Sequence, residues 1–156
     1  MKKALCLLAA VLLCFGVSGC GGEGYEDTNG ADDFTLETIT DENIINLDVG
    51  ASGLSYSEEN IGDVLSSAEY SSKNFNGVEQ IFLENYILPS DVQVYIGTMN
   101  VTEGNFKLVA VLDGEIIQEF PLDAFNETFT FEDIEGEFSI HVAGENAAFD
   151  FYLEVM

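Results

Sequence analysis

The sequence predicts an all-β protein built as an antiparallel two-sheet β-sandwich, either immunoglobulin-like or jelly-roll in topology. Apolar and polar residues alternate with a period of two through most of the second half of the chain, as they do in half-buried strands. The dipeptide Asp113-Gly114 joins two β-rich runs, which is a strong hairpin signal. No helical segments alternate regularly with the strands, so a parallel βαβ architecture is disfavoured. Together these observations predict a sandwich of seven to nine strands.

The predicted folded domain covers residues 34–156, and its first third has the weaker pattern. Period-two alternation predicts strands over 34–38 and 45–49, followed by a glycine-containing turn over 50–53. A spacing of three to four residues among Ile61, Val64 and Leu65 predicts a short helix near 57–66.

The central part of the chain has the clearest strands. An apolar-rich run over 78–88 is expected to stop at Pro89-Ser90-Asp91, and a second strand is expected over 92–97. The run 106–112 is joined by Asp113-Gly114 to the run 115–120. Because a type I′ turn requires positive φ at both central residues, Asp-Gly is well suited to it.

The C-terminal strands are predicted over 129–131, 138–143 and 149–155. In the last of these strands every second residue is apolar, which predicts one buried face and one solvent-exposed face. Inward spacing assigns these phenylalanines to the core: Phe129, Phe131, Phe138, Phe149 and Phe151. His141 alternates onto the opposite face, so we expect it to be a surface residue of its strand.

The N-terminus has the pattern of an export signal. Lys2 and Lys3 precede a segment over 4–17 that contains no charged residue. That segment is shorter than the ~20 residues that a helix needs to span a bilayer. Its length and the small residues that follow it predict a signal peptide over 1–19.

The four residues Val17-Ser18-Gly19-Cys20 end this segment. They resemble the lipobox of bacterial lipoproteins, in which an aliphatic residue and two small residues precede an obligatory cysteine. The resemblance covers residues 1–20 alone. It implies that the Cys20 thiol receives a diacylglyceryl group, that the chain is cleaved between Gly19 and Cys20, and that the new amino group often receives an acyl chain such as palmitate.

Cleavage there would leave a strongly acidic chain with a single cysteine. The other two cysteines, Cys6 and Cys14, lie in the signal, so the mature chain could form no internal disulfide. Two of the four basic residues would also leave while all 29 acidic residues remain, giving a net charge of −27. Such a chain repels nucleic acid and anionic lipid headgroups. Residues 20–33 hold the lipidated cysteine followed by a glycine-rich, acidic stretch, which predicts a flexible tether.

The sequence offers no catalytic constellation, and we assign no catalytic residue. His141 is the sole histidine, and no Gly-x-Ser-x-Gly motif is present. We expect no resident metal or other cofactor, because zinc sites need clustered cysteine, histidine or carboxylate ligands. A weak surface calcium site at the loops of Asp113 or of Glu132-Asp133 is the one alternative.

These observations predict a membrane-anchored bacterial lipoprotein that faces the extracytoplasmic side, with a non-catalytic domain that interacts with an unidentified protein or glycan. One alternative is a carbohydrate-binding module, which would need a row of exposed aromatic side chains. The tyrosines predicted to be exposed are Tyr56, Tyr70, Tyr86, Tyr95 and Tyr152. A second alternative is a hydrolase that uses paired carboxylates.

Overall fold

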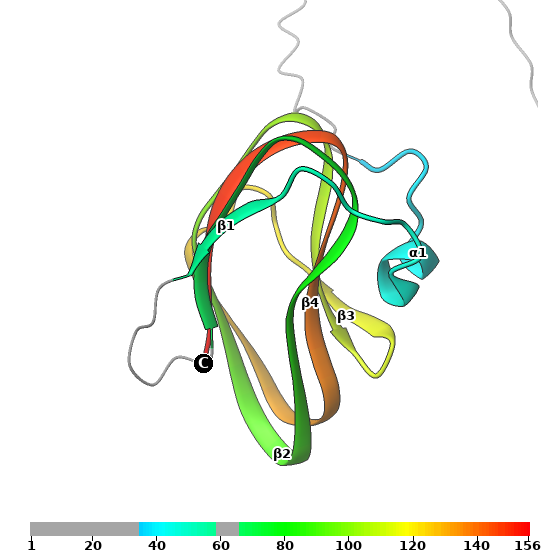
Figure 1. Cartoon of the computed structure of the whole chain (residues 1–156). Coiled ribbons are helices and arrows are strands. Elements are labelled where there is room, and N and C mark those ends of the chain that lie inside the picture. Colours follow the sequence, from blue (N-terminus) through cyan, green and yellow to red (C-terminus); the bar gives the residue numbers. More distant parts are fainter. Residues whose placement is uncertain (1–34, 59–65) are drawn as a thin grey trace, which may run out of the picture. The chain divides into compact units, whose positions relative to one another are not determined.

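The structure is a computed structural model, and it describes residues 35–58 and 66–156. The predicted signal peptide, the predicted tether and Phe34 lie outside the described residues. Within them the chain is almost entirely β-structure, and all strand pairs are antiparallel, as predicted (Figure 1). The elements are α1 (Asp41–Asn46), β1 (Ser55–Glu58), β2 (Ser66–Leu112), β3 (Glu115–Glu119) and β4 (Phe125–Val155).

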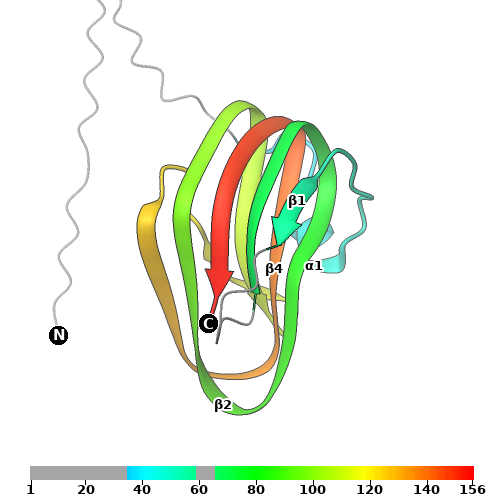
Figure 2. The same cartoon turned by 60° about the vertical axis from the view of Figure 1, so that its left-hand side comes forward.

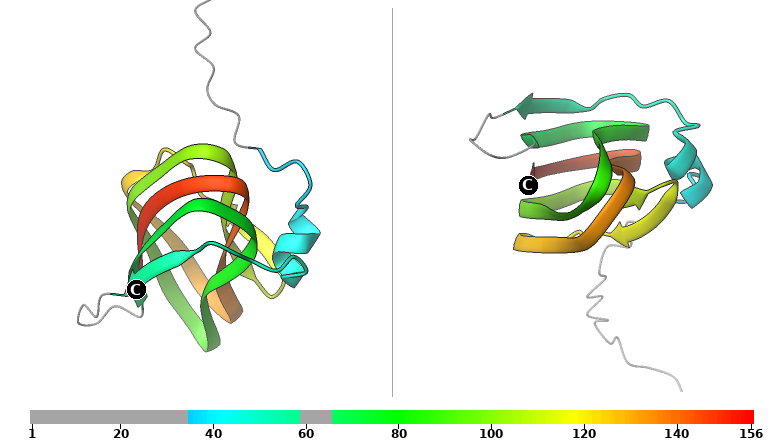
Figure 3. Two further views of the ribbon diagram at one scale, coloured as in Figure 1. Left: turned by 45° about the horizontal axis from the view of Figure 1, so that its top comes forward. Right: turned by 90° about the horizontal axis from the view of Figure 1, so that it is seen from below.

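Two long strands, β2 and β4, bend several times and form most of the sheet (Figure 2). Residues 149–155 of β4 pair with 66–72 of β2 on one side and with 94–101 on the other. Residues 138–144 of β4 are likewise flanked by 77–84 and 106–112 of β2. This nested order corresponds to the double Greek key of a jelly roll. Figure 3 shows β1, β2 and β4 segments side by side in the order that these pairings require.

The predicted division into two separate sheets is not confirmed. Because β2 and β4 continue through their bends, all four strands belong to one hydrogen-bonded sheet that curls over its own core. The predicted stop at Pro89-Ser90-Asp91 is one of these bends. Strand β2 continues through it, and the register shifts between Tyr86 and Val92.

The hairpin predicted at Asp113-Gly114 is confirmed. Leu112 pairs with Glu115, and the φ angles of Asp113 and Gly114 are 48° and 78°. Asp113 also fixes the neighbouring strand, since its carboxylate accepts a hydrogen bond of 2.9 Å from the backbone N–H of Glu137.

The strands predicted over 34–38 and 45–49 are wrong within the described residues. Residues 35–40 are irregular, and Asp41–Asn46 form the helix α1. The helix begins with a capping box, in which the Thr40 hydroxyl accepts from the Asn43 N–H and the Asn43 side chain accepts from the Thr40 N–H. These local bonds satisfy backbone donors that a strand would have left to a neighbour.

The helix predicted near 57–66 is only partly testable. Residues 57 and 58 belong to β1, and Ser66 begins β2, so the prediction is wrong at its two ends. Residues 59–65, which carry the spacing behind that prediction, lie outside the described residues.

The main core lies inside the curled sheet and is rich in phenylalanine. Phe138, Phe149 and Phe151 are buried as predicted, while Phe129 and Phe131 are half-buried and pack against the same core. Phe106 joins them from β2, with its ring centroid 4.4 Å from that of Phe149. The alternation predicted for the last strand is confirmed, because its apolar side chains are buried while Asp150 is exposed.

A second, smaller core lies under α1, and it corrects the prediction for His141. Ile44 of α1 is fully buried against strand residues that face away from the main core, among them Val109 and Ala143. His141 shares this outer face, and its side chain is only 3 % exposed. The prediction placed His141 on the correct face of its strand. It was wrong about exposure, because residues 36–49 cover that face.

The imidazole of His141 is held in one orientation. Its Nδ1 lies 2.8 Å from the backbone carbonyl oxygen of Ile44, which can only accept, so Nδ1–H is the donor. Burial lowers the pKa of His141 and outweighs the opposing effects of the bond to Ile44 and of the Glu137 carboxylate. His141 is therefore a neutral core residue that ties α1 to β4.

A carboxylate anchors the segment that precedes α1. Glu145 accepts hydrogen bonds from the backbone N–H groups of Glu37, Thr38 and Ile39 at 2.7, 2.6 and 2.9 Å. The Thr38 hydroxyl and the Asn105 amide also donate to it. Partial burial acts to raise the pKa of Glu145, but these donors lower it to about 2.

We expect the Glu145→Gln variant to lose about 1 kcal/mol of stability at neutral pH, because an amide accepts these bonds less strongly than a carboxylate. The ionised Glu145 stabilises the fold above its ordinary pKa of 4.5, and that contribution is lost as the pH falls toward 2. Urea unfolding of both proteins at pH 7 and pH 3 measures the difference. A gap between wild type and variant that stays constant with pH would contradict the proposed role.

Candidate functional site

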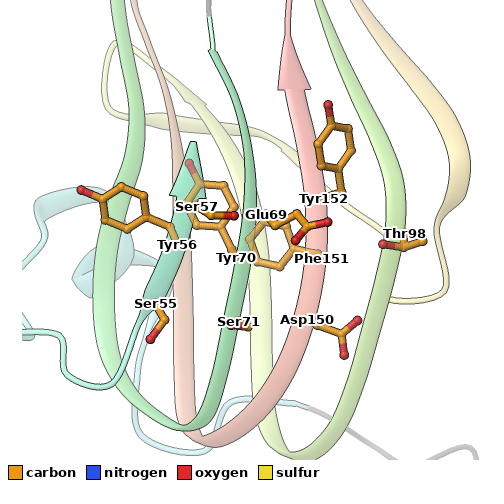
Figure 4. Close-up of a pocket in the computed structure, with 10 residues that line it drawn as sticks. All are labelled: Ser55, Tyr56, Ser57, Glu69, Tyr70, Ser71, Thr98, Asp150, Phe151 and Tyr152. Atoms are coloured by element: carbon orange, nitrogen blue, oxygen red, sulfur yellow. The ribbon is translucent and has the colours of Figure 1, made fainter. Parts of the chain in front are cut away.

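A shallow groove of about 360 Å³ lies over β1, β2 and β4 (Figure 4). We call it the outer groove, because most of its lining side chains belong to the face of the sheet that points away from the main core. Its lining residues are Ser55, Tyr56, Ser57, Glu69, Tyr70, Ser71, Thr98, Asp150, Phe151 and Tyr152.

Strand register brings these residues together from four stretches of chain. Ser71 pairs with Ser55 of β1 on one side and with Asp150 of β4 on the other. Two residues further along the strands, a second row follows the same order: Ser57, Glu69, Tyr152 and Thr98. Adjacent strands lie ~4.8 Å apart, so this second row spans about 14 Å across the sheet.

The small side chains explain why the surface is hollow there. Serine and threonine occupy four outward positions of the outer groove, while the bulkier side chains of Glu69, Asp150 and Tyr152 stand beside them (Figure 4). The sheet itself forms the floor, and it is supported from below by the stacked rings of Tyr70 and Phe151, whose centroids are 4.9 Å apart. The floor is therefore rigid, because it is the reverse side of the main core.

Several polar groups of the outer groove have no partner in the part of the chain that the structure describes. Among the described residues, the hydroxyls of Ser55, Ser57, Ser71 and Thr98 and the carboxylate of Glu69 make no hydrogen bond. Asp150, in contrast, accepts a 3.0 Å hydrogen bond from the Asn100 amide. The uncommitted groups are donors and acceptors that face solvent and that a ligand can use.

A second hollow of about 540 Å³ adjoins the outer groove. It shares Ser55, Ser71 and Asp150 with the outer groove and extends to Lys73 and Thr102. The two hollows share these three residues and are therefore continuous along the strands, and Ala148 and Phe149 give the second hollow an apolar part. Lys73 introduces a positive charge at the end of this surface that lies away from Glu69.

The tyrosines predicted to be exposed behave differently from one another. Tyr56 is 63 % exposed at the edge of the sheet, whereas Tyr70 is buried, so the prediction for Tyr70 is wrong. Tyr95 and Tyr152 are half-buried and meet edge to face at 6.4 Å between ring centroids. Tyr86 is also half-buried, and burial, reinforced by the Glu84 charge, raises the pKa of its phenol. The tyrosines thus do not form the planar row that a stacking platform needs.

Other predicted sites lie away from the outer groove or outside the structure. His141 lies in the core under α1, and Gly19 and Cys20 lie outside the described residues. Within residues 35–58 and 66–156, no three histidine, cysteine, aspartate or glutamate side chains gather as metal ligands. The calcium site at Asp113 or Glu132-Asp133 stays a prediction.

Sequence reasoning did not find the outer groove as a site. The alternating polar residues Glu69 and Ser71, and likewise Asp150 and Tyr152, are visible in the sequence as the outward faces of two strands. What places them together is the pairing of residues about 80 positions apart, which no local pattern reveals.

The part of the chain that the structure describes contains no helix with the length and apolar character needed to cross a membrane. No protein-family model matches the sequence, and no curated protein matches it. Among solved structures, a cupin superfamily protein from Desulfitobacterium hafniense DCB-2 is similar at 14 % identity with a TM-score of 0.33. That match covers 66 % of this chain and 75 % of the other, and at this level it has no bearing on function.

Proposed function

We propose that this protein is a bacterial lipoprotein, anchored through Cys20, whose β-domain binds a ligand in the outer groove outside the cytoplasm without catalysing a reaction. The observation that supports the binding role is the set of uncommitted hydroxyl and carboxylate groups over a rigid, hollowed sheet face. The anchor is supported by the sequence Val17-Ser18-Gly19-Cys20 after a short apolar segment.

Two features support the non-catalytic part of the proposal. The outer groove cannot use a histidine as general base, because the sole histidine of the sequence is buried under α1 and bonded to Ile44. Of the two carboxylates in the groove, Asp150 already accepts a hydrogen bond from the Asn100 amide, which leaves Glu69 as the groove carboxylate without a partner among the described residues. A hydrolase of this kind needs two carboxylates, one acting as acid and the other as base or nucleophile.

The anchor is tested by the Cys20→Ala variant, which we expect to move from the membrane fraction to the soluble fraction almost completely. The strongly acidic domain is repelled by anionic headgroups, so it has no electrostatic attraction to keep it at the membrane. Fractionation after a high-salt wash measures the release, and the intact mass of the wild-type protein reports cleavage at Gly19 together with the added lipid.

The matched control is Cys14→Ala, since Cys14 lies in the predicted signal and should leave the protein membrane-bound. If Cys20→Ala stays with the membranes after the wash, or if the mature mass still contains residues 1–19, the lipid-anchor proposal is wrong.

A further inference from the structure

We infer that the outer groove binds a neutral glycan chain laid across β1, β2 and β4. The inference deepens the proposed function, because it assumes a binding domain and names the chemical class of its ligand. The groove, rather than any row of aromatic rings, is the feature on which it rests.

The side chains of the outer groove have the chemistry that a polyhydroxylated ligand requires. Sugar hydroxyls both donate and accept hydrogen bonds, and serine and threonine hydroxyls do the same. Each protein hydroxyl can therefore act as donor or as acceptor toward the ligand. The Glu69 carboxylate accepts only, and its two oxygens can receive two neighbouring hydroxyls of one sugar. A sugar bound here would pair with groups that have no partner among residues 35–58 and 66–156, so it would break no hydrogen bond of the described fold.

The shape of the surface agrees with an extended ligand. The row Ser57, Glu69, Tyr152 and Thr98 crosses four neighbouring strand segments, and its length of about 14 Å accommodates a short oligosaccharide. The adjoining hollow continues the surface along the strands past Ser71 and Asp150. An extended chain can therefore continue from the groove into the adjoining hollow, where it would also contact Ala148 and Phe149.

Charge selects against the other classes of ligand. Glu69 and Asp150 lie in the groove of a chain whose net charge is −25 over the whole sequence, so anionic glycans are repelled. A basic peptide is the main competitor for such a surface. We favour the neutral glycan because hydroxyls outnumber carboxylates in the groove, and because Asp150 already accepts from the Asn100 amide.

The test uses the full-length protein purified in detergent, with cellohexaose, mannohexaose, xylohexaose and chitohexaose as neutral probes. An oligogalacturonate serves as the anionic probe and polylysine as the cationic one. Calorimetric titration at low and high salt measures each affinity. We expect at least one neutral hexasaccharide to bind with an affinity that salt leaves unchanged, since the interaction involves no ion pair.

The groove is tested by the double variant Glu69→Gln/Ser71→Ala, which we expect to weaken that binding about tenfold, the effect of losing one to two hydrogen bonds. Both residues are exposed, so the fold should be unaffected. The matched control is Glu79→Gln/Ser52→Ala, which makes the same chemical changes at exposed positions that do not line the groove. The control should bind like the wild type.

Three outcomes would overturn the inference: no neutral probe binds, the groove variant binds as well as the control, or only polylysine binds and salt abolishes its binding. The last result would identify a cationic partner instead. Mass spectrometry of the sugar after incubation separates this inference from the proposed function. If an oligosaccharide binds and is then shortened, the glycan assignment holds and the non-catalytic role is wrong. If no oligosaccharide binds, the glycan assignment is wrong, but the result of the Cys20→Ala test for the lipid anchor is unaffected.

Discussion

Replacing Phe106 by alanine is expected to lower the free energy of unfolding by about 3–5 kcal/mol. Phe106 is 1 % exposed, and its ring centroid lies 4.4 Å from that of Phe149 and 6.1 Å from that of Phe151. Removing the ring deletes buried apolar surface and leaves a cavity that the curled sheet can fill only partly. Urea unfolding followed by circular dichroism measures the change.

The control for this prediction is Phe125→Ala, at the first residue of β4. Phe125 is 69 % exposed, so its loss should change the stability by less than about 0.5 kcal/mol. Equal effects of the two substitutions would mean that Phe106 does not belong to a tightly packed core.

The second large effect is expected at Gly77, in β2. Its φ angle is +106°, and a Cβ atom there would lie 2.2 Å from the carbonyl oxygen of Gly50. Two causes therefore act together in Gly77→Ala: the backbone conformation is strained for an L-residue, and the new methyl group clashes with main chain that cannot rotate away. We expect a loss of at least about 2 kcal/mol.

The chain itself provides the control, because a Cβ atom at Gly50 would meet nothing within 4 Å. Gly50→Ala should be close to neutral in the same urea unfolding measurement. If Gly77→Ala is equally tolerated, the close approach of residues 49–52 to β2, seen in the 3.0 Å hydrogen bond from the Val78 N–H to the Val49 carbonyl oxygen, does not persist in solution.

The predictions from sequence succeeded where one face of a strand or one turn determines the outcome. The alternation of Phe149, Phe151, Leu153 and Val155 predicted a strand with one buried face because side chains of a strand point to alternate sides. Asp113-Gly114 predicted a hairpin because its two residues tolerate positive φ. Both arguments need only neighbouring residues.

The predictions were wrong where contacts with residues far away in the sequence determine the secondary structure or the burial of a side chain. Period two over 45–49 predicted a strand, but the capping box of Thr40 and Asn43 starts a helix just before it, and Ile44 of that helix enters the second core. His141 was predicted to be exposed to solvent because its neighbours in the strand face the main core. Residues far away in sequence cover it, and the strand pattern contains no information about them.

Local backbone preference and the two-residue period of a strand were enough to predict the all-β class, the main hairpin and the inward set of phenylalanines. They could not predict that one curled sheet is formed, that α1 and its flanking residues cover His141, or that Ser71 lies between Ser55 and Asp150 in the outer groove. Those features depend on strand pairing between residues far apart along the chain, and the register of that pairing is fixed by the packing of the whole core.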